Sequence, residues 1–198
     1  MKGNDIKRLG FAIVASIILA ACGGGGGGGA NTVPVDFSTA DAAAKALIDT
    51  YVDAFGNPAT GQPRSTSFVQ TGNVEYAGGL RGDLGGSGVV GDLTIAVAFD
   101  GGGVTGTLQN LQNEVSGAYT GSLQGTGSID ADAAANVPQM MLTFDGNLGS
   151  TSGTQAVTLL LDGNFFSHDS NPEGAVAGAA EGTIGGVVLQ DGLFAAEE

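Results

Sequence analysis

Two residues draw attention first because the chain has only one of each: Cys22 and His168. Thiols and imidazoles are common nucleophiles, bases and metal ligands in proteins. A Ser-His-Asp triad could use only His168, and no G-x-S-x-G sequence accompanies it. Zinc sites built from several Cys or His ligands are excluded by these counts. We therefore expect no enzyme, no cofactor and no metal ion, unless carboxylates such as Asp145 and Asp162 meet in a cleft.

The sequence around Cys22 points to a different chemistry. Residues 1–21 carry three basic residues among the first eight and continue as an apolar run from Phe11. This pattern is typical of a secretory signal, and the run is too short for an ordinary membrane span. Leu19-Ala20-Ala21-Cys22 resembles the lipobox of bacterial lipoproteins at all four positions. The resemblance implies cleavage before Cys22 and acylation, for instance with palmitate, so that the mature chain is held to a membrane. An ordinary signal peptide with a chance cysteine is the alternative, but it leaves the single thiol unexplained.

Seven consecutive glycines, Gly23–Gly29, follow the cysteine, and residues 22–37 are expected to form a flexible tether. A phosphate-binding loop is excluded because no GK[ST] sequence follows. An Asp directly after the lipidated cysteine resembles the inner-membrane retention signal of bacterial lipoproteins, and this chain has Gly23 at that position. We therefore expect the outer membrane, with the domain exposed at the cell surface; the periplasmic face is the alternative.

The charge of the chain limits its partners. The formal net charge is −14, and three of the six basic residues lie in the leader. A surface this acidic repels phosphate backbones and anionic lipid, so nucleic acid is not an expected partner. Attachment to a membrane must then come from the lipid on Cys22.

Residues 38–56 form the predicted helical region. Ser38 or Thr39 is the expected cap, and Gly56 lies just past the end. One face at helical spacing is apolar and is expected to pack on the following domain, although a partner-binding helix is an alternative. This face contains Leu47, Ile48, Tyr51, Val52 and Phe55.

From about residue 70 the apolar residues follow a period of two, which predicts strands. The expected strands are Asn73–Leu80, Val90–Phe99, Gly103–Leu111, Gly117–Ile129, Met140–Gly146, Ala156–Phe166, Gly174–Glu181 and Gln190–Ala196. In the clearest of them Phe99 shares the apolar face, so its ring is expected inside the domain. Asp-Gly pairs at 100, 145, 162 and 191 suggest turns, although some could lie in bulged strands. We predict an all-β domain over 70–198, a single antiparallel eight-stranded up-and-down barrel, with an open sandwich as the alternative.

Several short motifs resemble the barrel domain of the transferrin-binding protein B family. Residues 71–78 (TGNVEYAG) resemble its opening strand, and residues 91–107 (GDLTIAVAFDGGGVTGT) resemble its signature hairpin. Residues 176–179 and 192–196 are similar to its last two strands. The same barrel occurs in factor H-binding lipoproteins and in hemophilins, so the resemblance implies a surface lipoprotein that presents loops to a solute or a host protein. Here there is one barrel without a second lobe, and a helix replaces the family's accessory sheet.

His168 follows two aromatic residues, Phe165 and Phe166. A haem iron could take His168 as an axial ligand with aromatic packing nearby, whereas the plainer alternative is a solvated loop histidine. Three functions therefore compete. They are non-enzymatic capture of a solute (such as haem or another iron source) or of a protein, a structural or immune-shielding lipoprotein with a filled barrel, and an enzyme. An apolar void inside the barrel favours solute capture, and a filled core favours the second function.

Overall fold

The computed structural model describes residues 36–66, 70–130 and 138–198, all within the compact unit formed by residues 34–198. The signal, Cys22 and most of the tether therefore lie outside the described residues. The described part contains one α-helix followed by nine strands. No helix in it is both long and apolar enough to cross a membrane.

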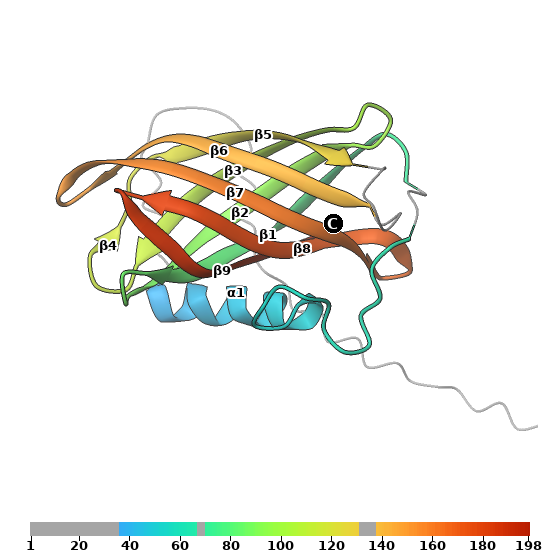
Figure 1. Cartoon of the computed structure of the whole chain (residues 1–198), viewed down its shortest axis with the longest axis horizontal. Coiled ribbons are helices and arrows are strands. Elements are labelled where there is room, and N and C mark those ends of the chain that lie inside the picture. Colours follow the sequence, from blue (N-terminus) through green and yellow to red (C-terminus); the bar gives the residue numbers. More distant parts are fainter. Residues whose placement is uncertain (1–35, 67–69, 131–137) are drawn as a thin grey trace, which may run out of the picture. The chain divides into compact units, whose positions relative to one another are not determined.

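Eight of the strands form a closed antiparallel barrel (Figure 1), which confirms the predicted fold class. Each strand pairs with its neighbour along the chain, and β1 closes the cylinder against β9. The strands are β1 (Asn73–Leu84), β2 (Gly88–Ala98), β3 (Gly103–Asn113), β5 (Ser122–Asp130), β6 (Gln139–Ser150), β7 (Gly153–His168), β8 (Asn171–Ile184) and β9 (Val187–Glu197). Closure leaves no exposed sheet edge of the kind that promotes aggregation.

One predicted strand, 117–129, is divided. A short strand β4 (Gly117–Ala118) pairs with the end of β3, and β5 begins at Ser122. Between them Gly121 has a φ of 104°, a left-handed conformation that interrupts the strand and that glycine adopts easily.

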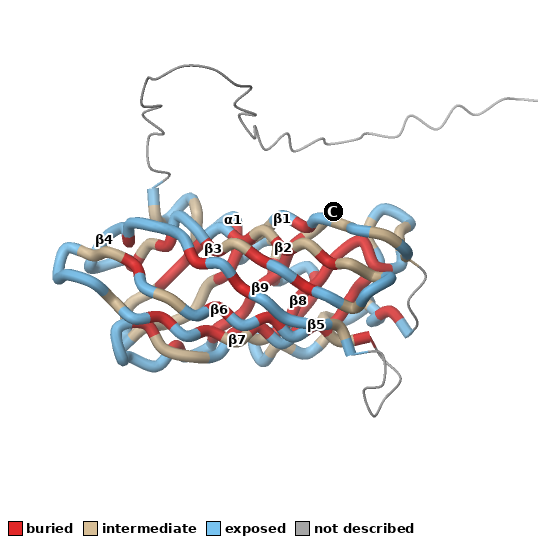
Figure 2. The backbone as a smooth tube through the Cα atoms, turned by 90° about the horizontal axis from the view of Figure 1, so that it is seen from above, coloured by how far each residue is buried: buried red, intermediate tan, exposed pale blue. Residues whose placement is uncertain are grey.

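The period-two pattern sets which side chains face the barrel interior. In β2, Leu93, Ile95 and Val97 are buried, while Thr94 and Ala96 are partly exposed on the outer wall. Phe99 lies just beyond β2 in the turn and is only partly buried, although its ring packs on that of Phe165 with centroids 5.5 Å apart. Buried and exposed positions alternate along the strands in Figure 2.

Three of the four Asp-Gly pairs are not turns. Only Asp100-Gly101 lies in a turn, whereas the pairs at 145, 162 and 191 lie inside β6, β7 and β9. The glycines at 146 and 163 make room for large core side chains: a Cβ on Gly163 would lie 2.6 Å from the Phe194 ring. Asp191 has a φ of 49° beside a register shift between β8 and β9, so this pair lies in a bulged strand, the alternative to a turn.

Helix α1 (Phe37–Tyr51) lies against the outer wall of the barrel over β1 and β9 (Figure 1). Neither Ser38 nor Thr39 caps it, because the helix begins one residue earlier with Asp36 at the N-cap position, and the Ser38 hydroxyl donates to the Asp36 carboxylate instead. The helix also ends at Tyr51, four residues before Phe55, the last helical residue that the sequence predicted. Val52 turns to an extended conformation and bridges to Pro58, which leaves Phe55 86% exposed rather than packed on the domain.

Candidate functional site: a groove on the outer wall

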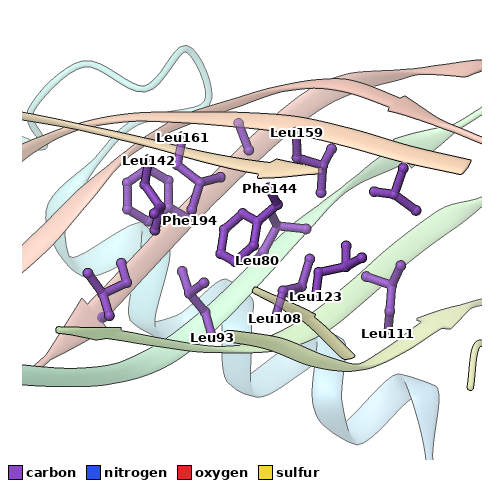
Figure 3. Packing of buried hydrophobic residues seen from close by; sticks show 14 of the residues in the cluster. Leu80, Leu93, Leu108, Leu111, Leu123, Leu142, Phe144, Leu159, Leu161 and Phe194 are labelled. Atoms are coloured by element: carbon purple, nitrogen blue, oxygen red, sulfur yellow. The ribbon is translucent and has the colours of Figure 1, made fainter. Parts of the chain in front are cut away.

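The barrel interior is occupied by side chains. Leucine, phenylalanine and other apolar residues from all eight barrel strands meet in a single cluster, and most of them are 0–2% exposed (Figure 3). Phe144 and Phe194 fill the middle of this cluster together with the leucines labelled around them. A filled core is the arrangement expected of a structural or shielding lipoprotein, whereas solute capture inside the barrel calls for a void.

The three residues considered for haem binding occupy different surroundings. Phe165 is buried inside the barrel, and Phe166 is buried on the outside, where its ring lies 5.5 Å from that of Tyr51. Because side chains alternate across a strand, two adjacent aromatic residues of β7 cannot line one pocket. His168 is the last residue of β7, not part of the following loop. The structure brings His168 and Phe166 to the same outer region and separates both from Phe165.

His168 belongs to a polar cluster under the end of α1. Its Nδ1 lies 2.8 Å from the Tyr51 hydroxyl, which donates to Oε1 of Glu197 at 2.6 Å. Since a phenol has one proton to donate, Tyr51 must accept the other bond, which places a proton on Nδ1 of His168. The Nε2 atom, which would have to bind an iron, lies 3.5 Å from the Asp169 carboxylate. Burial raises the pKa of Tyr51 above its ordinary value, and the hydrogen bond to Glu197 acts in the same direction.

Sequence reasoning missed the partners in this cluster. Tyr51 and Glu197 are separated from His168 by 117 and 29 positions; the pairing of β8 with β7 and β9 brings Glu197 near His168, and the docking of α1 adds Tyr51. A buried carboxylate was missed in the same way. Glu173 is 0% exposed and accepts hydrogen bonds from the Ser65 hydroxyl at 2.9 Å and from the Gln70 N–H at 3.1 Å. Glu173 thereby ties Ser65 and Gln70 to β8, which is a structural task.

Among the described residues, two surface pockets lie on the outer wall of the barrel. The larger, of about 620 Å³, lies between the turn after α1 and the paired strands β8 and β9. We call it the outer groove. Its lining residues include Ala54, Phe55, Ala179, Val188 and Leu193, together with the acidic residues Glu181 and Asp191. Phe55 and Val188 are 86% and 57% exposed. The groove thus combines an apolar lining with two carboxylates.

The turn that carries Phe55 is held in place by hydrogen bonds. The Asp53 carboxylate accepts from the N–H groups of Phe55 at 2.8 Å and of Asn57 at 3.0 Å. These two backbone bonds and the Asn57 side chain lower the pKa of Asp53. Gly56, with a φ of 76°, places the backbone where a Cβ would be 3.5 Å from Leu193 and 3.6 Å from Ala179. Gly56 therefore seats the turn on the barrel and does not terminate the helix.

The floor of the groove is shaped by the irregular pairing of β8 with β9. The register shifts between Ala179 and Gly182, opposite Asp191 in its left-handed conformation. The β8–β9 hairpin turns at Gly185 and Gly186, both with positive φ, and Val188 is the second residue of β9 after this turn. The turn after α1 thus borders the groove, and the irregular part of the β8–β9 pair forms its floor.

The electrostatic surroundings of the groove are acidic. Asp162 stands beside Ala179 on the neighbouring strand, and burial, followed by the charge of Glu181, raises its pKa. No salt bridge in the described part of the chain involves Asp162, Glu181 or Asp191. The basic side chains there have other partners: Lys45 pairs with Asp49, Arg81 pairs with Asp41 at 2.9 Å, and Arg64 donates to Asn164.

The second pocket is smaller, about 160 Å³, and lies on the outer faces of β1, β2, β3 and β5. Its lining is mostly hydroxyl and amide groups, from Thr94, Thr105, Thr107 and Gln124. Within the described ranges, no group of three or more His, Cys, Asp or Glu side chains is placed to hold a metal ion.

Comparisons of the chain with protein families, with curated proteins and with solved structures find no match. Inference about function therefore rests on the packed barrel core and on the chemistry of the outer groove.

Proposed function

We propose that this protein is a lipid-anchored surface lipoprotein whose barrel is a filled, non-enzymatic scaffold that acts through its outer wall. The observation that carries the proposal is the packed interior, in which Phe144, Phe165 and Phe194 are each 0% exposed. A barrel that captures a solute inside needs a void between its walls, as in small ligand-binding barrels. Large side chains occupy that position here, which supports a role in shielding the cell surface or contacting a protein.

The anchor in this proposal rests on the lipobox-like residues 19–22 and on the run of seven glycines in the sequence after them. A run of seven glycines has an end-to-end distance of about 15 Å, enough to keep the barrel close to the membrane without fixing its orientation. Diacylation gives stable anchoring, whereas one chain binds only marginally. This arrangement suits a domain whose outer wall faces the surroundings of the cell.

Native mass spectrometry of the full chain, extracted from the membranes of its own host, tests the filled barrel. We expect the protein mass with its lipid and no further retained small molecule. A Phe144→Ala variant provides the matched control, because an apolar cavity of this kind stays dry and binds small apolar molecules such as benzene. A stoichiometric solute in the native protein, or haem that binds it tightly and is lost on His168→Ala, would overturn the proposal in favour of solute capture.

Metabolic labelling with a palmitate analogue tests the anchor separately. The native chain should be labelled and found with the membranes, whereas Cys22→Ser should be unlabelled. Equal labelling of both chains would refute lipidation at Cys22.

A further inference from the structure

We propose that the outer groove docks a basic, amphipathic segment of a partner protein, with an apolar side chain of that segment seated between Phe55 and Val188. The inference rests on the proposed function, in which a partner meets the outer wall of the barrel, and it deepens that function by naming the class of partner. Three features of the groove support it: the hydrogen-bonded turn that carries Phe55, the apolar lining and the uncompensated charge.

Phe55 is exposed because its turn holds it out, not because the turn is loose. Two backbone N–H groups of residues 55 and 57 bind the Asp53 carboxylate, and the Asp53 N–H donates to the Asn57 carbonyl at 2.7 Å. An aromatic side chain on an ordered turn loses little conformational freedom on binding, and aromatic residues, Phe included, are enriched in protein interfaces.

The lining opposite Phe55 is suited to an apolar side chain. Val188 is 57% exposed on the border of the groove, and Leu193 and Ala179 lie beneath it. The side chains of Leu193 and Ala179 are small or aliphatic and offer no hydrogen-bonding group. An apolar side chain entering here removes the exposed surface of Phe55 and Val188 from water, which is the driving force of the contact.

The charge around this apolar lining selects the partner. Glu181 and Asp191 line the groove, and Asp162 stands beside it on β7. The nearest basic side chain along the sheet is Arg81, paired with Leu193 across β1 and β9, and its guanidinium is already bound to Asp41. Glu181 lies diagonally across the β7–β8 pair from Asp162, so the two carboxylates repel one another, and burial first and this repulsion second raise the pKa of Asp162. A Lys or Arg beside the apolar anchor would relieve this repulsion and give the contact specificity.

Two other occupants fit this groove less well. A second copy of the chain, in a symmetric contact, would bring the same carboxylates against each other in a protein of net charge −14. A lipid surface with anionic headgroups meets the same repulsion. A basic protein segment satisfies both the apolar and the acidic part of the groove.

The test measures binding of fluorescent peptides to the full chain in phosphatidylcholine nanodiscs, by fluorescence polarisation at low and moderate salt. The probes are a 12-residue peptide of Lys and Leu, a Lys and Ser peptide of equal charge, and a Glu and Leu peptide. Phe55→Ser removes the anchor, and Val115→Ser is its matched control, because Val115 is 79% exposed in the turn between β3 and β4. The pair Glu181→Gln with Asp191→Asn removes the two charges, and Asp92→Asn with Asp145→Asn removes the same number elsewhere.

We expect the Lys and Leu peptide to bind best and Phe55→Ser to weaken it about tenfold, as for a central interface residue. Val115→Ser should leave its affinity unchanged. The charge pair at the groove should weaken binding more than the remote pair and should reduce its salt dependence. Equal effects of Phe55→Ser and Val115→Ser, equal binding of the two Lys peptides, or a dimer of the native chain that Phe55→Ser dissolves would each overturn the inference. None of these results depends on whether a solute is retained inside the barrel, so the two proposals fail separately.

Discussion

At the scale of single residues, burial separates side chains that look alike in the sequence. Phe144 and Phe55 are both large apolar residues in regular patterns, yet Phe144 is 0% and Phe55 is 86% exposed. The ring of Phe144 lies over Gly125, its partner on β5, and over Gly106 on the next strand, β3, since a Cβ at either glycine would lie within 3.1 Å of the ring. The ring of Phe144 is thus enclosed, and the ring of Phe55 is available to a partner.

We expect Phe144→Ala to lower the free energy of unfolding by about 3–5 kcal/mol, through lost burial and the cavity that remains. Phe55→Ala is the matched change and should alter it by less than about 0.5 kcal/mol, as for most surface substitutions. Denaturant unfolding followed by circular dichroism measures both. Similar losses for the two variants would contradict the assignment of Phe55 to a free surface.

Asp162 gives a prediction with a defined pH dependence. Its pKa is raised in the folded protein by burial and by Glu181, so the folded state binds the proton more tightly than the unfolded state does. The ionised carboxylate therefore costs stability at neutral pH, and this cost disappears as the pH falls through the folded pKa towards the unfolded value of about 3.9. Asp162→Asn should stabilise the protein by about 0.5 kcal/mol at pH 7, a value discounted for solvent screening.

The advantage of Asp162→Asn over the native chain should shrink as the pH is lowered towards about 4, the ordinary pKa of the carboxyl group. Asp145→Asn serves as the control, because the Asp145 carboxylate accepts a hydrogen bond from Thr158 at 2.8 Å that Asn can also accept. Thermal melts at several pH values provide the measurement. A stabilisation by Asp162→Asn that grows on acidification would show that the sign is wrong.

At the scale of elements, small residues on the outer wall let α1 lie close to the barrel. Gly79 of β1 and Ala175, Ala177 and Ala195 of β8 and β9 form the surface under the helix. Against them α1 packs Ala44, Ile48 and Tyr51, all of which are buried. A Cβ on Gly79 would lie 3.0 Å from the Cβ of Ala44, so the helix and the strand are already at the limit of approach.

We expect Gly79→Val to push α1 away from the barrel and to destabilise the protein by about 1–3 kcal/mol, as overpacking does elsewhere. Gly103→Val is the control, because nothing lies within 4 Å of a Cβ at this exposed strand position. Near-ultraviolet circular dichroism of the tyrosines and protection of α1 amides from hydrogen exchange report the displacement. Unchanged protection of α1 in Gly79→Val would mean that the helix is not packed as described.

The same element scale shows why the sequence predicted some features and not others. Period-two alternation located all the barrel strands, because in a closed small barrel one face of every strand must be buried. It did not predict that Asp145-Gly146 and Asp162-Gly163 continue their strands, because those glycines make room for Leu123 on the adjacent strand β5 and for Phe194 on β9, contacts that are remote in the sequence. The end of α1 was misplaced for a similar reason, since the chain leaves the helix to pair Val52 with Pro58.

The outer groove could not be predicted from the sequence at all. Phe55 and Val188 lie 133 positions apart, and Phe55 fits the spacing of the buried helix face. Its exposure results from the early end of α1 and from the Asp53 turn. The charge of the groove was visible only as the acidity of the whole chain.

At the scale of the whole molecule, the acidic excess is spread over a closed surface with few compensating charges. The formal net charge is −14, and the three basic side chains of the described part are already bound to Asp49, Asp41 and Asn164. Carboxylates brought together by folding repel one another, and this repulsion opposes the compact state. The same excess of negative charge makes copies of the chain repel one another.

Salt should stabilise the fold by screening that repulsion. Raising NaCl from about 10 mM to about 300 mM shortens the screening length from roughly 30 Å to less than 10 Å. The weaker repulsion should raise the Tm by about 2–5 °C, a shift that corresponds to roughly 1 kcal/mol for a domain of this size.

Neutralising two remote carboxylates, by Asp92→Asn with Asp145→Asn, should reduce the gain that salt produces without changing the fold. Because the ion pairs Lys45–Asp49 and Arg81–Asp41 weaken in salt, a Tm that falls instead would show that these pairs outweigh the repulsion. Differential scanning calorimetry at the two salt concentrations decides between the two signs.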